Sequence, residues 1–243
     1  MQIIWLGHGG WRIEVEGAVL LVDPWLTGNP MFPEGRRADA IRGATHIVLT
    51  HGHNDHTGDM LAIAKELGIP LVGIPELMGY FAERHGCETI DFNKGGTVDL
   101  NGAKVTMVNA THSSSMTVDG QTIYAGTESG YVIAGEGRTI YFSGDTDVMA
   151  DMKIIADLHA PDIGILCAGG HYTMDMTRAA YAAKTFFDFS LVLPSHYRTF
   201  PLLAQDASVL QAGLPGVTVH EPEVLTPCLL YTSPSPRDRQ KSR

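Results

Sequence analysis

Short apolar segments separated by glycine, proline and aspartate run through most of the chain. Three of them open the sequence, at 2–7, 11–16 and 18–24. The second alternates apolar and polar residues, as a half-buried strand does. The segment 45–50, "THIVLT", is apolar almost throughout and predicts a strand that is buried on both faces. The N-terminal part of the chain is therefore predicted to form consecutive strands.

Helical spacing of apolar residues begins directly after these strands. Residues 57–67, "TGDMLAIAKEL", have apolar side chains at helical intervals and stop at Gly68. Residues 75–86 begin with proline and end with glycine, which is typical of a helix. The short apolar segment 70–74 between these two helices predicts a strand.

A second group of strands follows, and it is again followed by helices. The expected strands are 96–100, 103–110, 121–126, 130–135, 138–145, 162–168 and 191–196, with helices near 148–158 and 176–187. Strands that come in two groups, each followed by helices, predict an α/β (α+β) protein. We expect one domain in which two sheets pack face to face with helices outside.

Composition and charge narrow the function classes. The 243 residues, 44% of them hydrophobic, supply enough apolar surface for one large core. The net charge of -10 argues against nucleic acid or an anionic membrane as a partner and favours a small-molecule substrate. No apolar run approaches the length of a membrane helix, and the start lacks the basic segment of a signal peptide. Three scattered cysteines are typical of a cytoplasmic protein. The protein could also form a homo-oligomer, which the sequence does not decide.

The composition changes abruptly at Cys228, where the chain becomes rich in serine, proline and arginine. Residues 228–243 also resemble the translated read-through of a sequencing-library adapter. We therefore expect a domain of residues 1–227 followed by a non-native tail.

The stretch "THGHNDHTGD", residues 50–59, contains three histidines and two aspartates. Residues two apart in an extended segment point the same way, so His51 and His53 can bind one metal ion from one side. Asp55 and His56 follow as the chain turns into a helix and can face a second ion. Imidazole suits zinc, and a carboxylate adds the negative charge that holds a second divalent cation. The alternative is a polar turn in which Asp55 caps the helix.

Three further candidate ligands stand at the ends of other predicted strands, where loops commonly build sites. They are His112, Asp145 and His196. We expect His51, His53 and His112 on one ion and Asp55, His56 and His196 on the other, with Asp145 bridging the two. Each strand-end residue alone is weak evidence for a metal site, since a strand-end aspartate, for example, usually forms a turn.

Polar residues near these candidates suggest supporting roles. Asp23 precedes a proline, so it either forms a turn or hydrogen-bonds a ligand histidine. The serines 113–115 are expected to be partners of His112. His171, in a glycine-rich loop, either donates a proton to a leaving group or caps a helix. His8, in "GHGG", is expected to lie outside the site.

The three residues after His196 are expected to bind substrate. Tyr197, Arg198 and Thr199 follow it directly. Arg198 either clamps a carboxylate or phosphate of the substrate or forms a surface ion pair.

Taken together, these motifs resemble the metallo-β-lactamase superfamily, and in particular its bacterial metal-dependent hydrolases, which are related to the ascorbate-6-phosphate lactonase group. The resemblance covers nearly all of residues 1–227 in order. The matching stretches are 21–30, 50–59, 93–100, 111–115, 141–155, 169–180 and 194–206. It implies an αββα sandwich of two mixed sheets flanked by helices, and all seven ligand positions of the family are filled.

The resemblance implies a metal-dependent hydrolase whose nucleophile is a hydroxide bridging two divalent metal ions, with Asp55 orienting it. Zinc is expected, and manganese or iron fits the same ligands. A small ester or lactone is the expected substrate, and a phosphodiesterase or nuclease is the alternative, which the negative charge disfavours. An oxygen-reducing di-iron enzyme is disfavoured by Asn54, where that group usually has glutamate. A non-enzymatic relative would usually have lost ligands, and here none is lost.

Overall fold

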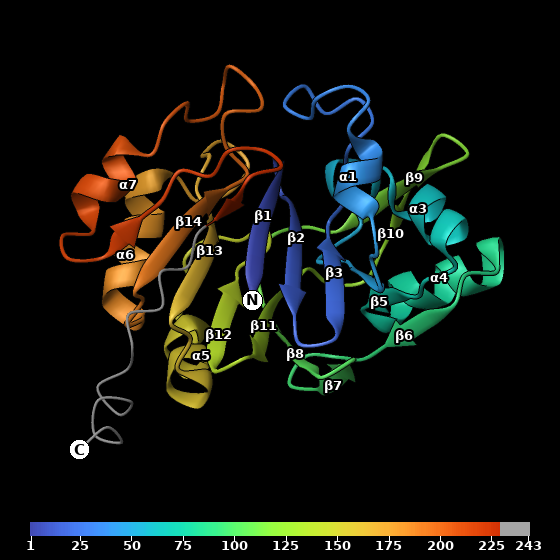
Figure 1. Cartoon of the computed structure of the whole chain (residues 1–243), viewed down its shortest axis with the longest axis horizontal. Coiled ribbons are helices and arrows are strands. Elements are labelled where there is room, and N and C mark those ends of the chain that lie inside the picture. Colours follow the sequence, from blue (N-terminus) through green and yellow to red (C-terminus); the bar gives the residue numbers. More distant parts are fainter. Residues whose placement is uncertain (229–243) are drawn as a thin grey trace.

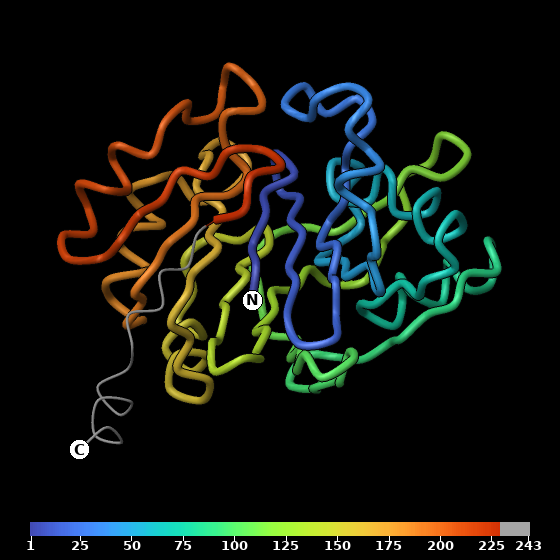
Figure 2. The backbone as a smooth tube through the Cα atoms, viewed as in Figure 1, coloured from blue at the N-terminus to red at the C-terminus, as the bar shows by residue number. Residues whose placement is uncertain are grey.

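The protein is described here by a computed structural model that covers residues 1–228. Residues 229–243, nearly all of the expected tail, lie outside the described residues. Cys228, the first residue of that expected tail, is described, and it is buried in a strand that pairs with Ile3. Figure 2 shows this red end of the described chain beside the blue N-terminal strand.

The first sheet has seven strands, antiparallel on one side and parallel on the other. The three N-terminal strands form antiparallel hairpins, and each of the next three strands pairs in parallel with its neighbour. In order across the sheet, they are β16 (Pro227–Cys228), β1 (Gln2–Gly7), β2 (Gly10–Val15), β3 (Ala18–Val22), β4 (His46–Val48), β5 (Leu71–Gly73) and β6 (Thr89–Asp91).

The second sheet repeats this plan. Its first strands pair antiparallel and its later strands pair in parallel. Across the sheet, they are β15 (Thr218–Val219), β14 (Leu191–Ser195), β13 (Ile163–Cys167), β12 (Arg138–Phe142), β11 (Ser129–Gly135), β8 (Ala103–Asn109) and β7 (Thr97–Leu100). A separate hairpin contains β9 (Ser115–Val118) and β10 (Gln121–Tyr124).

Helices flank the two sheets, as Figure 1 shows, with β1–β3 in front of β11 and β12. The helices are α1 (Arg37–Ile41), α2 (Asn54–Thr57), α3 (Met60–Leu67), α4 (Pro75–His85), α5 (Asp151–His159), α6 (Met176–Phe186) and α7 (Ser208–Gly213). The predicted αββα sandwich of two mixed sheets is thereby confirmed. Among the described helices, none is long and apolar enough to cross a membrane.

The two sheets share one hydrophobic core, and buried hydrogen bonds join them. Trp5, Trp11 and Tyr131 are fully buried in that core. The Trp11 indole donates to Ser195 Oγ at 2.9 Å, from β2 to the end of β14. The Tyr131 hydroxyl donates to the Leu49 carbonyl at 2.6 Å. These two polar contacts specify how one sheet sits on the other, because a misplaced sheet would leave the buried groups unpaired.

The expected helix 57–67 is wrong in its start, because the structure divides this region into α2 and α3. Asp59 lies between the two helices and is buried. Its carboxylate accepts hydrogen bonds from the backbone N–H of Leu26 and Thr27, at 2.6 and 2.7 Å, and from Thr27 Oγ1 at 2.6 Å. The helix is interrupted at Asp59, and the Asp59 carboxylate holds the loop that follows β3.

We expect Asp59→Ala to lower the free energy of unfolding by about 1–3 kcal/mol, because it leaves buried backbone donors unpaired. Denaturant titration of the variant beside wild type measures this difference. Asp188→Ala, at an exposed position, is the matched control and should change little. A change at Asp59 as small as the one at Asp188 would show that the loop does not depend on the carboxylate.

Candidate metal centre

The candidate ligands gather at one end of the two sheets. His51 follows β4 of the first sheet, and His112, Asp145 and His196 follow β8, β12 and β14 of the second. Each lies one to three residues beyond the end of its strand, where the backbone leaves the sheet. Both sheets therefore contribute side chains to one site.

A first group consists of His51, His53 and His112. One ring nitrogen from each lies within 4.8 Å of the others. His51 Nε2 and His53 Nδ1 are 3.0 Å apart. These are the three residues expected on one ion, and the structure brings them together.

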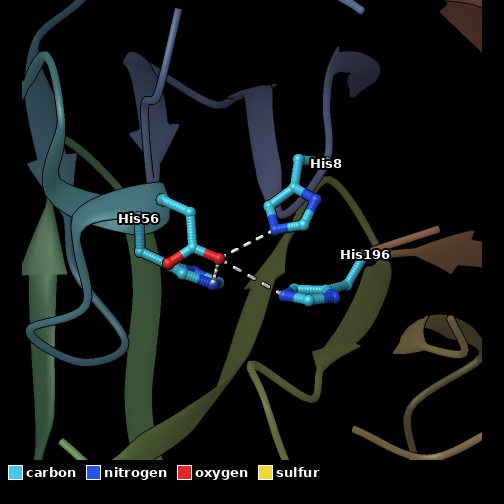
Figure 3. Close-up of side chains that lie close together, drawn as sticks. His8, His56 and His196 are labelled. Atoms are coloured by element: carbon cyan, nitrogen blue, oxygen red, sulfur yellow. Dashed lines mark hydrogen bonds and ion pairs between the residues drawn. The ribbon is translucent and has the colours of Figure 1, made fainter. Parts of the chain in front are cut away.

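A second group contains Asp55, His56 and His196, the residues expected on the other ion, together with His8. Figure 3 shows the rings of the three histidines turned towards one carboxylate, which the contact distances identify as that of Asp55. Its Oδ2 is 3.6 Å from His196 Nε2 and 3.8 Å from His56 Nε2.

Asp145 lies between the two groups and is buried. Its Oδ2 is 3.1 Å from His196 Nε2 and 3.3 Å from His56 Nε2, both in the second group. The same oxygen is 3.7 Å from His112 Nε2 in the first group. One carboxylate oxygen thus faces both groups, which is the position expected of a bridging ligand.

Asp23 supports one histidine of each group, so its role exceeds that of a turn former. Its Oδ2 accepts from His56 Nδ1 at 2.8 Å and from Thr50 Oγ1 at 2.6 Å. Because the Thr50 hydroxyl has given its proton to Asp23, the contact of 2.9 Å between Thr50 Oγ1 and His51 Nδ1 requires a proton on Nδ1. With Nδ1 bound in this way, Nε2 is the nitrogen of His51 and of His56 that faces the site and can bind a metal ion once it is deprotonated.

His8 belongs to the site, so the expectation that it lies outside was wrong. It is fully buried, and its Nε2 lies 2.9 Å from Asp55 Oδ2, which can only accept a hydrogen bond. Burial lowers the pKa of His8 to about 4, so the neutral ring carries its one proton on Nε2. Its Nδ1 then accepts from Thr199 Oγ1 at 2.8 Å. Through the contact at Nε2, His8 orients the Asp55 carboxylate.

The carboxylates of Asp55 and Asp145 favour positive charge in the second group. Burial would lower the pKa of His56 and of His196, but the Asp145 carboxylate outweighs it. The pKa of His56 therefore lies well above its usual value, and that of His196 is raised to about 9. Burial would also raise the pKa of Asp145, yet these two imidazoles hold it well below its usual range. Cations can supply the same charge.

One buried nitrogen of the second group also fits a metal. His56 Nε2 is buried without a hydrogen-bond partner among the described residues. An unpaired buried polar atom costs free energy, and His56 Nε2 points at the carboxylates of the second group. Imidazole nitrogens and carboxylate oxygens are the donor set that zinc, manganese and iron bind. The residues present therefore fit two divalent cations.

Two glycines allow the chain to approach the second group closely. A Cβ on Gly9 would lie 2.7 Å from His56 Cε1, and one on Gly169 would lie 1.9 Å from the His196 carbonyl oxygen. The "GHGG" turn between β1 and β2 therefore packs directly on the ligand loop. The backbone carbonyl of His8 also accepts from the His196 N–H at 2.9 Å.

A cavity of about 500 Å³ opens beside the two groups. Its wall includes five of the candidate ligands and the aromatic residues Trp25, Tyr172 and Phe200. Its lining residues are Trp25, His53, Asn54, Asp55, His112, Ser113, Asp145, Tyr172, His196 and Phe200. Of these aromatic residues, Trp25 and Phe200 were not predicted, while the glycine-rich loop that contains Tyr172 was expected near the site.

The residues expected to bind substrate after His196 lie elsewhere. Tyr197 is fully buried and stacks on Trp5 with ring centroids 5.3 Å apart. Burial raises the pKa of its hydroxyl to about 12. The Arg198 guanidinium lies over the same two rings, 6.0 Å from Trp5 and 5.8 Å from Tyr197. Thr199 is buried beside His8. None of the three is among the residues that line the cavity: Tyr197 packs in the core, Thr199 supports His8, and Arg198 is exposed.

Two further predictions concerned His171 and the serines 113–115. His171 is exposed and is not among the cavity-lining residues, where its neighbour Tyr172 stands instead, with ring centroids 4.5 Å apart. Support of His112 by the serines 113–115 stays a prediction; the backbone N–H of His112 donates to Glu128 Oε1 at 2.8 Å. Ser114 Oγ accepts from the Gly52 N–H at 3.2 Å, within the ligand loop.

Comparisons with known proteins agree with this fold. The Beta-lactamase superfamily domain matches residues 19–197. A UPF0173 metal-dependent hydrolase of Paracoccus denitrificans (strain Pd 1222) is 66% identical over 227 residues, which cover 93% of this chain and 99% of that protein. A second, from Ruegeria pomeroyi, is 57% identical over 225 residues, 93% of this chain and 98% of that protein.

A solved structure with lower sequence identity supports the same fold. Igni18, a metallo hydrolase from the archaeon Ignicoccus hospitalis KIN4/I, is 33% identical with a TM-score of 0.79, covering 94% of this chain and 98% of that one. With a domain match over most of the chain and relatives of this identity, the chain belongs to the β-lactamase superfamily, as a metal-dependent hydrolase of its UPF0173 family.

Proposed function

We propose that this metal-dependent hydrolase uses two divalent cations, with zinc as the expected metal, to cleave a small ester or lactone. The observation that supports two cations is the position of Asp145 Oδ2, which lies within 3.7 Å of imidazoles from both groups. His51, His53 and His112 would hold one cation. Asp55, His56 and His196 would hold the other, with Asp145 shared.

When bound, such a pair of cations lowers the pKa of water towards 7 and polarises the substrate carbonyl. The chain's own residues orient and protect the reaction. His8 donates to Asp55 and fixes its carboxylate, and Asp23 fixes the ring orientation of His56. The aromatic wall of the cavity excludes bulk water from one side of the substrate.

The metal content tests the proposal directly. We expect about two divalent ions per chain in protein purified without chelator, because six residues in two groups and a shared carboxylate exceed what one tetrahedral ion can use. Elemental analysis of the native protein measures this number. Protein that holds no metal even after zinc addition would overturn the proposal.

A substrate screen tests the reaction class. On metal-reconstituted protein we expect turnover of carboxylic esters or lactones. Phosphodiesters should be poorer substrates. A preference for phosphodiesters would instead support the phosphodiesterase alternative. The cytoplasmic location, the small-molecule partner and the homo-oligomer stay predictions.

A further inference from the structure

The cavity has two chemically different sides. The candidate ligands form one part of its wall, and Trp25 and Phe200, whose ring centroids are 6.2 Å apart, form an aromatic side. Tyr172 also lines the cavity. A cavity of about 500 Å³ lies in the range of sites that enclose one small molecule. A substrate whose reacting carbonyl lies at the ligands must therefore extend along the aromatic side.

The aromatic side is held in place by its own contacts. The Trp25 and Phe200 ring centroids are 6.2 Å apart, and the buried His8 ring contacts both, at 5.3 and 5.6 Å. The Trp25 indole N–H already donates to the Thr27 carbonyl at 2.9 Å. Asp59 fixes the backbone of that loop. The polar atom of Trp25 is thus satisfied, and what its ring offers a ligand is an apolar surface.

This loop and the loop of Phe200 come from different sheets. Trp25 follows β3, and Phe200 follows β14. In Figure 2 the blue loop before α1 and the orange loop after β14 project from the same edge of the molecule. The aromatic side therefore spans the boundary between the two halves of the fold, directly beside the ligands.

Among the described residues, no lysine or arginine lines the cavity. Arg198, the nearest in sequence to a ligand, has its guanidinium over Trp5 and Tyr197. The Arg178 guanidinium is bound by the Asp147 carboxylate at 2.7 and 2.9 Å. An anionic substituent packed on the aromatic rings would lose part of its hydration and find no lysine or arginine beside it, which is costly.

We propose that the substrate is a neutral molecule with an alkyl or aryl group that packs on Trp25 and Phe200. This inference rests on the proposed hydrolase function and narrows its substrate class. It excludes esters and lactones whose group opposite the reacting carbonyl ends in a carboxylate or phosphate.

A matched ester pair tests charge discrimination. Methyl hexanoate and monomethyl adipate have the same chain, which ends in a methyl group in the first and in a carboxylate in the second. With the metal-loaded full chain, we expect kcat/KM to favour methyl hexanoate by about tenfold or more. Equal values, or a preference for monomethyl adipate, would overturn the inference.

A binding measurement separates this inference from the reaction. Hexanamide and adipic acid monoamide repeat the pair without the ester, and their binding is followed by tryptophan fluorescence. Trp5 and Trp11 are fully buried, so the signal is assigned to Trp25 by its loss in Trp25→Leu. Tighter binding of hexanamide without ester turnover would sink the ester function and leave the substrate pocket standing. If hexanamide binds no better than the acid, the pocket inference fails.

Two substitutions test the wall itself. Trp25→Ala should raise KM for methyl hexanoate several-fold more than KM for methyl acetate, because methyl acetate is too short to use the ring. Tyr181→Ala removes an exposed aromatic side chain on α6 and is the matched control. Phe200→Lys should shift the preference towards monomethyl adipate. Equal loss for acetate and hexanoate in Trp25→Ala would contradict the inference.

Discussion

Asp145→Asn is expected to leave a folded protein that binds at least one metal ion more weakly and has lost about a hundredfold or more of its turnover. Asparagine keeps the shape of the side chain and suits a strand-end turn about as well as aspartate. It removes the negative charge that His56, His112 and His196 face at 3.1–3.7 Å. The expected loss corresponds to part of the several kcal/mol that metal catalysis supplies.

The measurement is metal stoichiometry and kcat of Asp145→Asn, with circular dichroism to verify the fold. Asp147→Asn is the matched control, since Asp147 lies two residues away, is exposed and binds Arg178. It should keep both metal ions and near-normal turnover. Two tightly bound ions and near-normal turnover in Asp145→Asn would remove Asp145 from the site.

His8→Asn is expected to weaken the binding of the metal ion at the second group by about 10–100-fold, which is the usual scale for a residue that supports a ligand. Binding of the ion at the first group should be unaffected. Asparagine tolerates the backbone φ of 52° at this position but is too short to keep both contacts of the imidazole. Asp55 then loses the donor that fixes its carboxylate. The side chain of His8 contacts only residues of the second group among the candidate ligands, so the effect should be selective.

Competition with a chromophoric chelator resolves the two binding steps of His8→Asn. His8→Gln, which can again donate to Asp55, should recover part of the second affinity. His220→Ala, at an exposed position, is the control and should match wild type. Equal weakening of both ions, or a general loss of thermal stability, would show that His8 serves the fold and has no particular role at the second ion.

The strands and the candidate ligands could be predicted because their signals are local. Apolar runs mark the central strands, and His112, Asp145 and His196 stand within three residues of strand ends. The edge strands β15 and β16 have two residues each, too short for any periodicity. The helix expected at 57–67 divides because Asp59 bonds backbone more than thirty residues away, which no local pattern reveals.

The cavity could not be predicted in the same way. His8 reaches Asp55 across 47 positions of sequence, through a turn whose glycines permit the approach. Tyr197 and Arg198 were expected to contact substrate because they follow His196 in the sequence. The backbone turns there, since His196 and Arg198 both have positive φ, 55° and 66°. Tyr197 consequently turns back into the core beside Trp5. Only the pairing of the two sheets shows which side chains meet.

The origin of the ligands in both sheets has a consequence for the folded state. His51 comes from the first sheet, while His112 and His196 come from the second. Cations that bind all of them bind the assembled sandwich and not the unfolded chain, so their binding adds to the free energy of unfolding. At free metal a hundredfold above Kd, each such ion contributes about 2.7 kcal/mol. The amount of folded protein in a cell would then follow the supply of metal, and starvation for metal would remove the protein itself as well as its activity.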